Sequence, residues 1–165
     1  MKVTFAPRGI VQIDDAKLVF RNFSGKGDRY NREGDRNFAI VIPDPEIAEA
    51  LKEEGWNVKI KPDRDEDELP FMYLSVKVKF NDRGPNVYLI SGDRRVPLDE
   101  ESIGCLDSIM IDHADLDIRP YDWQLKDGTS GRAAYLQGMD AVQILDRFGE
   151  RHDRWAYENE YPRED

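Results

Sequence analysis

The stretch MYLSVKVKF, residues 72–80, alternates apolar and polar side chains along its length. Successive side chains of a β-strand point to opposite faces, so this alternation predicts a strand with one face in a core and one in solvent. The core face is expected to carry Leu74, Val76, Val78 and Phe80. The solvent face is expected to carry one tyrosine, one serine and two lysines: Tyr73, Ser75, Lys77 and Lys79.

The same alternation recurs on both sides of this stretch and predicts a mainly β protein. Further strands are expected at residues 9–13, 16–20, 37–42, 57–61, 87–91, 108–119 and 133–144. One short helix is expected at 45–54, where Asp44 can cap its start and Gly55 can end it. Residues 98–106 are expected to be partly helical. Many short strands with one firm helix favour a barrel or a sandwich.

Length and composition indicate one soluble domain. At 165 residues the chain is long enough for one core and short for two. The alternation ends near residue 145, so we expect a domain at 1–145 and a C-terminal extension with an acidic tail at 146–165. No apolar run approaches the roughly 18 residues of a membrane span. The single cysteine, Cys105, excludes an internal disulfide and fits a reducing cytoplasm.

Charge is distributed unevenly along the chain. The net charge of −10 by itself disfavours binding to phosphates. Residues 1–42, however, hold eight basic against five acidic side chains, and residues 71–97 hold five against two. Two basic segments in an acidic chain can form a positive groove on one face. A scatter of charges over a solvated surface is the plainer alternative.

Aromatic and basic residues are interleaved in the glycine-containing segment 20–36. Three aromatic residues, Phe20, Phe23 and Tyr30, lie among five basic ones, Arg21, Lys26, Arg29, Arg32 and Arg36. Unpaired bases stack on aromatic rings while Arg and Lys hold phosphates, so this mixture suits a single strand better than a duplex. The alternative is a polar hairpin loop with both phenylalanines in the core.

Two further sets combine aromatic and basic side chains. The strand at 72–80 presents Tyr73, Lys77 and Lys79, and flanking segments add Lys59, Lys61, Arg94 and Arg95. The extended segment 119–123 presents Arg119, Tyr121 and Trp123 on one face. Outward rows of this kind are the surfaces on which OB-type folds hold a single strand. Lysines that keep a strand soluble and a partly buried tryptophan would explain both sets without a ligand.

The acidic run at 112–117 is the one segment that suggests a metal. On a strand His113, Asp115 and Asp117 share a face, and with Asp112 they could bind a divalent cation in a nuclease or phosphatase. A solvated acidic face needs fewer assumptions. The sequence also contains no phosphate-cradling glycine motif and no nucleophile motif. We therefore expect no metal, no cofactor and no enzymatic activity.

The order of these features can be compared with known families. The strand AKLVFRNF (16–23), a basic loop, the strand RNFAIVIP (36–43), the helix and later strands precede an acidic tail. This order resembles phage single-stranded-DNA-binding proteins of the OB-fold type. The resemblance implies an OB-like five-stranded Greek-key barrel with extra strands, single-stranded DNA across its open face, and a tail that contacts replication proteins. The tail acids here are Glu158, Glu160, Glu164 and Asp165, interrupted by Arg163 and without a terminal Phe.

Three functions are consistent with the sequence. The leading prediction is a non-enzymatic single-stranded DNA-binding protein of phage replication or recombination in the host cytoplasm, with a homo-oligomer left open. Its expected DNA contacts are Arg21, Lys26, Arg29, Tyr30, Arg32, Arg36, Tyr73, Lys77, Lys79, Arg119, Tyr121 and Trp123. The second is a phage interaction protein, either a host-defence inhibitor or a DNA mimic, that binds a basic host protein through the acidic segments 43–70 and 98–118. The third is the metal-dependent nuclease or phosphatase.

Overall fold

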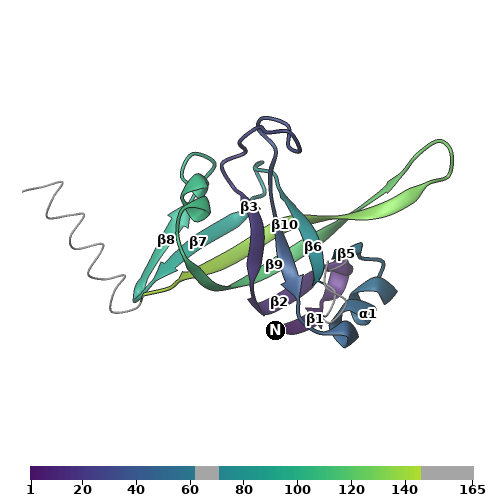
Figure 1. The fold of residues 1–165 in the computed structure, drawn as a ribbon, viewed down its shortest axis with the longest axis horizontal. Coiled ribbons are helices and arrows are strands. Elements are labelled where there is room, and N and C mark those ends of the chain that lie inside the picture. Colours follow the sequence, from purple (N-terminus) through teal and green to yellow (C-terminus); the bar gives the residue numbers. More distant parts are fainter. Residues whose placement is uncertain (62–70, 146–165) are drawn as a thin grey trace, which may run out of the picture.

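The computed structural model of the protein describes residues 1–61 and 71–145 (Figure 1). Apolar residues at alternate positions form ten strands in this part of the chain. The strands are β1 (Lys2–Phe5), β2 (Val11–Ala16), β3 (Leu18–Asn22), β4 (Arg36–Ile42), β5 (Val58–Lys61), β6 (Phe71–Val78), β7 (Asn86–Ser91), β8 (Arg94–Leu98), β9 (Ile111–Gln124) and β10 (Ser130–Gln143). The helices are α1 (Pro45–Glu53) and two short 3-10 segments, η1 (Pro7–Gly9) and η2 (Ile103–Asp107). Among these described residues, no helix is long and apolar enough to cross a membrane.

The continuous ribbon β2–β3 closes the sheet into a barrel. β2 pairs with β9, β3 pairs with β4, and only Lys17 separates the two strands. The circuit is completed by β10 and β6, which lie between β9 and β4. β6 and β10 are parallel, whereas the other barrel pairs are antiparallel. This is a five-stranded barrel of the OB type, with β2–β3 as its first strand, and it confirms the predicted mainly β, OB-like fold.

Four further strands extend the barrel. β1 pairs with β2, and β5 pairs with β6. β7 runs parallel to β10 and is followed by its antiparallel partner β8. β9 and β10 are 14 residues long each, and their connected ends project from the body as a hairpin (Figure 1). The barrel therefore carries a long arm on one side.

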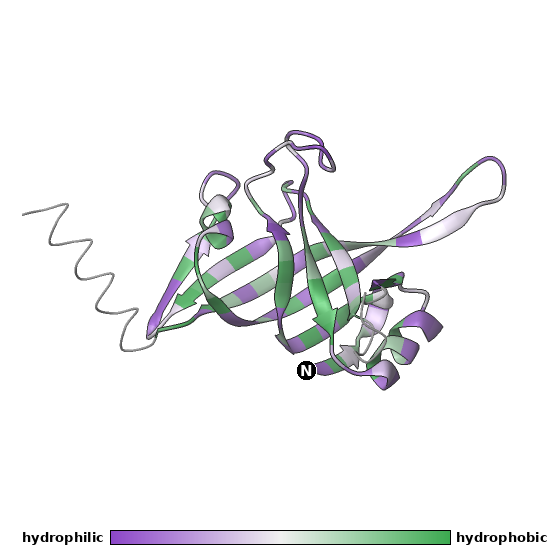
Figure 2. Cartoon of the chain, viewed as in Figure 1, coloured by the Kyte–Doolittle hydropathy of each residue, from purple (hydrophilic) through white to green (hydrophobic). Residues whose placement is uncertain are grey.

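The core fills the interior of the barrel with alternate side chains. Bands of hydrophobic and hydrophilic residues follow one another along the long strands (Figure 2). Val76 of β6, Ile118 of β9 and Leu136 of β10 are at most 2% exposed. Phe23 stacks on Phe38 inside the barrel with ring centroids 5.0 Å apart. Burial of this apolar surface, at roughly 25 cal/mol per Å², is the main stabilising term.

The expected elements agree with the observed ones at most positions. The helix begins at Pro45, with the Asp44 side chain accepting a hydrogen bond from the Glu46 N–H, and it ends at Glu53. The partly helical turn expected near 98–106 is η2. The domain boundary at residue 145 stays a prediction, and the predicted tail, residues 146–165, lies outside the described residues.

Three expectations about strands were wrong. β1 was not predicted, because its four residues are too few to show a period. β8 was not predicted either, since Pro97 and two arginines interrupt its pattern. β9 was expected to end at residue 119 and β10 to begin at 133, but they continue to Gln124 and back to Ser130. The projecting hairpin has no core beneath it, so its residues carry no apolar alternation.

Candidate nucleic-acid interface

The outer face of the barrel aligns side chains that are far apart in sequence. In OB folds the second and third strands, with the loops between strands 1 and 2 and strands 4 and 5, bind oligonucleotides. Here these parts are β4, β6, the loop at 23–35 and the β9–β10 hairpin. Lys77 of β6 pairs in register with Tyr135 of β10, which pairs in turn with Arg119 of β9. These three side chains point away from the core because the residues before them, Val76, Ala134 and Ile118, are buried.

The contacts within this row join cations to an aromatic ring. The Lys77 Nζ lies 5.9 Å from the centroid of the Tyr135 ring, and the Arg119 Cζ lies 5.0 Å from it. Tyr121, which is 55% exposed, meets Tyr135 edge to face at 6.0 Å. We call Lys77, Tyr135, Arg119 and Tyr121 the central row. It offers ring surface for a base and cations for phosphates within one line.

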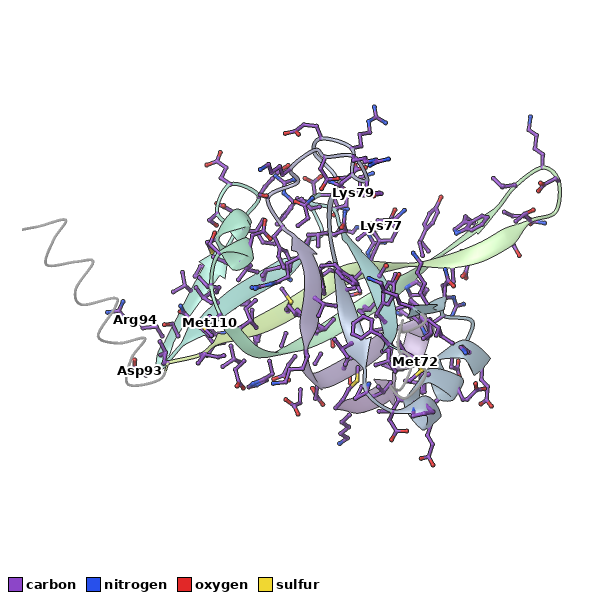
Figure 3. All side chains as sticks on the ribbon, viewed as in Figure 1. Met72, Lys77, Lys79, Asp93, Arg94 and Met110 are labelled. Atoms are coloured by element: carbon purple, nitrogen blue, oxygen red, sulfur yellow. The ribbon has the colours of Figure 1, made fainter. Side chains whose placement is uncertain are left out.

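The cations of this face are Lys77, Lys79 and Arg119. Among the described residues, Lys77, Lys79 and Arg119 have no carboxylate within 4.0 Å. Both lysines are exposed, and Figure 3 shows them between the loop at 23–35 and the β9–β10 hairpin. Cations that are not neutralised within the protein attract an external polyanion.

Trp123 continues the central row along the arm. The structure places it on the same face as Arg119 and Tyr121, as the sequence predicts, and it is 37% exposed. Its register partner is Gly131, and a Cβ added there would lie 2.4 Å from Cζ2 of the indole. The ring therefore rests directly on the glycine backbone, which fixes its orientation without burying its outer surface.

Replacing Gly131 with alanine is expected to displace the Trp123 indole, because the new methyl group would occupy the space of the ring. The tryptophan emission should shift to longer wavelength as the ring becomes more hydrated, and affinity for oligothymidine should fall. The matched control is Gly138→Ala, since the nearest atom to a Cβ at Gly138 is 3.5 Å away, an ordinary contact. Equal emission spectra for both variants would contradict this packing.

The loop at 23–35 is held by its own hydrogen bonds. The Asn31 Nδ2 donates to the carbonyl oxygens of Lys26 and Asp35, at 3.0 and 2.9 Å. The Asn31 Oδ1 accepts from the Asn37 Nδ2 of β4 at 2.8 Å. The bonds leave four predicted contact residues exposed: Lys26, Arg29, Tyr30 and Arg32. Tyr30 is 90% exposed, with the Arg29 Cζ 5.8 Å from its ring.

Two predicted phosphate ligands have partners within the protein. The Arg21 Nη1 donates to the carbonyl oxygens of Leu106 and Ile109, at 2.7 and 2.8 Å. These bonds tie β3 to the η2 segment and give Arg21 a structural role. The Arg36 Nη1 lies 3.5 Å from Glu100 Oε1, although Arg36 also lines a hollow with Lys77, Lys79 and Tyr135.

Tyr73 belongs to a second aromatic group, which was not predicted from the sequence. Its ring centroid lies 5.4 Å from that of Phe20 and 5.8 Å from that of Phe71. Phe20 is 55% exposed and has φ 51°, a rare conformation for a bulky residue. The Lys61 Nζ lies 5.9 Å from the Phe20 ring. The core alternative is thus correct for Phe23 and wrong for Phe20.

The structure also separates residues that the sequence grouped. Lys59 and Lys61 of β5 pair with Tyr73 and Phe71, so they flank the second aromatic group. Arg94 lies on β8, away from Lys77 and Lys79 (Figure 3). Tyr135 was missed, although its position between the apolar Ala134 and Leu136 indicated an outward side chain.

The acidic run of β9 does not form a metal centre in the described part of the chain, where no group of three His, Cys, Asp or Glu side chains could hold an ion. The Asp112 Oδ2 lies 2.7 Å from the His113 Nδ1, and this hydrogen bond lowers the pKa of Asp112. The Asp115 Oδ1 accepts from the Asp15 N–H at 2.9 Å. Burial, with a smaller effect of Asp14, raises the pKa of Asp117.

Three of the solved structures to which the chain is similar are bacteriophage proteins. The single-stranded DNA-binding protein from bacteriophage Enc34 is 17% identical, with a TM-score of 0.54 over 90% of this chain and 88% of that one. Its C-terminal truncation is 14% identical, with a TM-score of 0.53 over 87% and 91%. The protein gp2.5 of bacteriophage T7, a single-stranded DNA-binding protein, is 13% identical, with a TM-score of 0.45 over 94% and 97%.

Comparison of the sequence with models of protein families shows to which family the chain belongs. No curated protein matches the chain significantly. The family model described as "Putative phage ssDNA-binding domain" matches residues 2–160, nearly the whole chain. That span includes every element of the barrel and the central row. The chain therefore belongs to the family of phage single-stranded DNA-binding domains.

Proposed function

We propose that this family member binds single-stranded DNA on the outer face of β4, β6, β10 and β9 and acts, without catalysis, in phage DNA replication or recombination. The observation that carries the proposal is the central row, in which Tyr135 lies between Lys77 and Arg119. Bases can stack on the rings of this row, while its cations contact the adjoining phosphates. The family assignment favours this function over the acidic-surface and nuclease alternatives.

The proposed DNA path runs between the loop at 23–35 and the β9–β10 hairpin. Tyr121 and Trp123 extend the ring surface from the central row along the hairpin, and Tyr73 provides a separate surface on β6. Phosphates are proposed to contact five exposed cations of the loop and of β6 and one half-buried cation of β9: Lys26, Arg29, Arg32, Lys77, Lys79 and Arg119. Tyr30 is proposed to stack on a base at the loop. Arg36 contributes positive charge from the hollow that it lines with Lys77 and Lys79. Arg21 holds the start of the loop at 23–35 in place through its bond to the Leu106 carbonyl.

This surface suits a single strand for a physical reason. The faces of bases in a duplex are stacked on each other, whereas those of an unpaired strand are open to aromatic side chains. The protein as a whole has net charge −10, so the attraction is confined to this face. Non-specific adhesion to other polyanions is correspondingly weak.

Replacing Lys77 and Lys79 together with alanine tests this surface. Removal of one phosphate-binding cation should reduce the slope of log affinity against log salt by about 0.7, so removal of both lysines should reduce it by about 1.4. Affinity for oligothymidine is measured over a salt series by fluorescence anisotropy. The control removes Lys2 of β1 and Lys52 of α1, which are also exposed. Equal slopes for the two double variants would place Lys77 and Lys79 off the DNA path.

The acidic extension, residues 146–165, lies outside the described residues, and its role is proposed from sequence alone. Glu158, Glu160, Glu164 and Asp165 provide the negative charge with which such a tail could contact replication proteins. The same charge would compete with DNA for the lysines and arginines of the barrel. Assembly of several copies along a strand, in the host cytoplasm, completes the proposal.

A further inference from the structure

A basic hollow lies at the end of β6, beyond the central row. It has a volume of about 530 Å³, and its polar lining consists of Lys79, Asn81, Arg83, Asn86, Arg119 and Gln137. Three of these side chains are cations and three are amides, and no Asp or Glu lines the hollow within the described chain. We call this hollow the turn pocket. A carboxylate-free set of this kind is unusual in a protein with 34 acidic residues.

The turn between β6 and β7 builds one wall of the pocket. The Asn81 N–H donates to the Gly84 carbonyl at 2.9 Å, and the Gly84 N–H donates back to Asn81 at 3.1 Å. The Arg83 N–H donates to the Asn81 Oδ1 at 2.9 Å. The Asn81 side chain thus uses its acceptor within the turn, and its two N–H donors have no partner among the described residues.

The pocket is continuous with the proposed DNA path. Arg119 lines it and also lies over Tyr135 of the central row. Lys79 lines both this pocket and the neighbouring hollow that contains Lys77 and Tyr135. A strand with a base stacked on Tyr135 would therefore bring the adjacent phosphate to the mouth of the pocket.

We propose that the turn pocket holds a backbone phosphate of the bound single strand, with Arg83 as its principal cation. This proposal rests on the proposed function and extends the path beyond its predicted residues. Guanidinium and amide N–H groups are the donors that phosphate oxygens accept from. The cations neutralise the phosphate, and the amides of Asn86 and Gln137 add hydrogen bonds without opposing charge.

The test uses two substitutions that alter the pocket and leave the core intact. Arg83→Ala removes one cation from an exposed turn, and Asn86→Asp places a carboxylate in the lining with little change in shape. Affinity for an oligothymidine of about 16 nucleotides, near the upper site size of one OB fold, is measured over a salt series. Arg94→Ala on β8 and Gln12→Glu on β2 are the matched controls, since both residues are exposed outside the pocket.

We expect Arg83→Ala to reduce the salt slope by about 0.7 and Asn86→Asp to weaken binding most at low salt, where charges are least screened. The matched controls should change neither quantity as much. The measurement is repeated with oligothymidines that carry or lack a terminal phosphate. Equal effects of Arg83→Ala on both indicate a backbone phosphate, whereas an effect confined to the phosphorylated strand overturns that assignment in favour of a strand end.

Failure of this inference can be told apart from failure of the proposed function. If the wild type binds oligothymidine and the Lys77/Lys79 variant is weakened, but both pocket variants behave as their controls do, only the turn pocket is wrong. If the wild type does not bind at low salt, the proposed function fails as well. Circular dichroism of each variant confirms that the fold is retained.

Discussion

Removing Tyr121 and Tyr135 together, by substitution with alanine, should weaken the binding of oligothymidine by roughly 30-fold or more. Stacking of one base on one aromatic ring contributes ~1–3 kcal/mol, and the double variant removes two rings of the central row. The two rings are in contact, with their centroids 6.0 Å apart, so the effects of losing each ring on affinity are expected to be coupled rather than additive. The measurement is the dissociation constant from fluorescence anisotropy at one fixed salt concentration.

The matched control for this variant is Tyr88→Ala. Tyr88 also faces outward and has an arginine over its ring, with the Arg95 Cζ 3.9 Å from its centroid, but it lies on β7 away from the central row. Its loss should leave affinity almost unchanged. Retention of most of the wild-type affinity by the Tyr121/Tyr135 variant would show that bases do not stack on the central row.

Replacing Phe38 with alanine should destabilise the fold by about 3–5 kcal/mol, the usual cost of truncating a buried aromatic residue. Phe38 is 1% exposed and stacks on Phe23, which lies at the base of the loop at 23–35. The cavity would therefore loosen both the barrel and the attachment of that loop. Urea denaturation followed by circular dichroism gives the free energy of unfolding.

Phe5→Ala provides the comparison, because Phe5 is 43% exposed on β1 and its loss leaves no internal cavity. The expected loss of stability is then below about 1 kcal/mol. Similar losses for Phe5 and Phe38 would mean that the Phe23–Phe38 stack is not part of a tightly packed core.

The sequence was sufficient to predict most of the strands, but its local patterns did not show which strands pair to close the barrel. Alternation at 72–80 predicted β6 and its outward tyrosine and lysines, because a half-buried strand repeats every two residues. The closure depends on a ribbon that pairs with β9 along β2 and with β4 along β3. It also needs the parallel pairing of β6 with β10, about 58 residues apart in sequence. Neither of these long-range pairings produces a recognisable pattern in the local sequence.

Most residues of the candidate site were predicted, but Tyr135 was not, and the geometry was predicted only in part. Arg119, Tyr121 and Trp123 share a face because β9 is regular at that point. Phe20 could not be distinguished from Phe23, since the register shift in β3 between Val19 and Asn22 decides which ring turns outward. Arg21 resembled a phosphate ligand, and its bonds to backbone carbonyls some 85 residues away could not be foreseen.

The turn pocket illustrates a second limit of sequence reasoning. Arg83 lies in the turn between β6 and β7 and Asn86 is the first residue of β7, in a segment whose composition is that of any polar turn. They become a candidate phosphate site only because β9 brings Arg119 to the same hollow. The central row arises in the same way, since Tyr135 joins Lys77 to Arg119 across three strands.

The most direct test of the central claim compares the wild-type protein's affinity for an oligothymidine with its affinity for the duplex of the same length, at low and at high salt. If bases stack on the central row, the single strand should bind more tightly at both salt concentrations, because the rings cannot reach bases that are stacked within a duplex. The difference should persist at high salt, where the attraction of phosphates to lysine and arginine is weakened for both ligands. Equal affinities for the two ligands, or no binding of the single strand at low salt, would contradict the account.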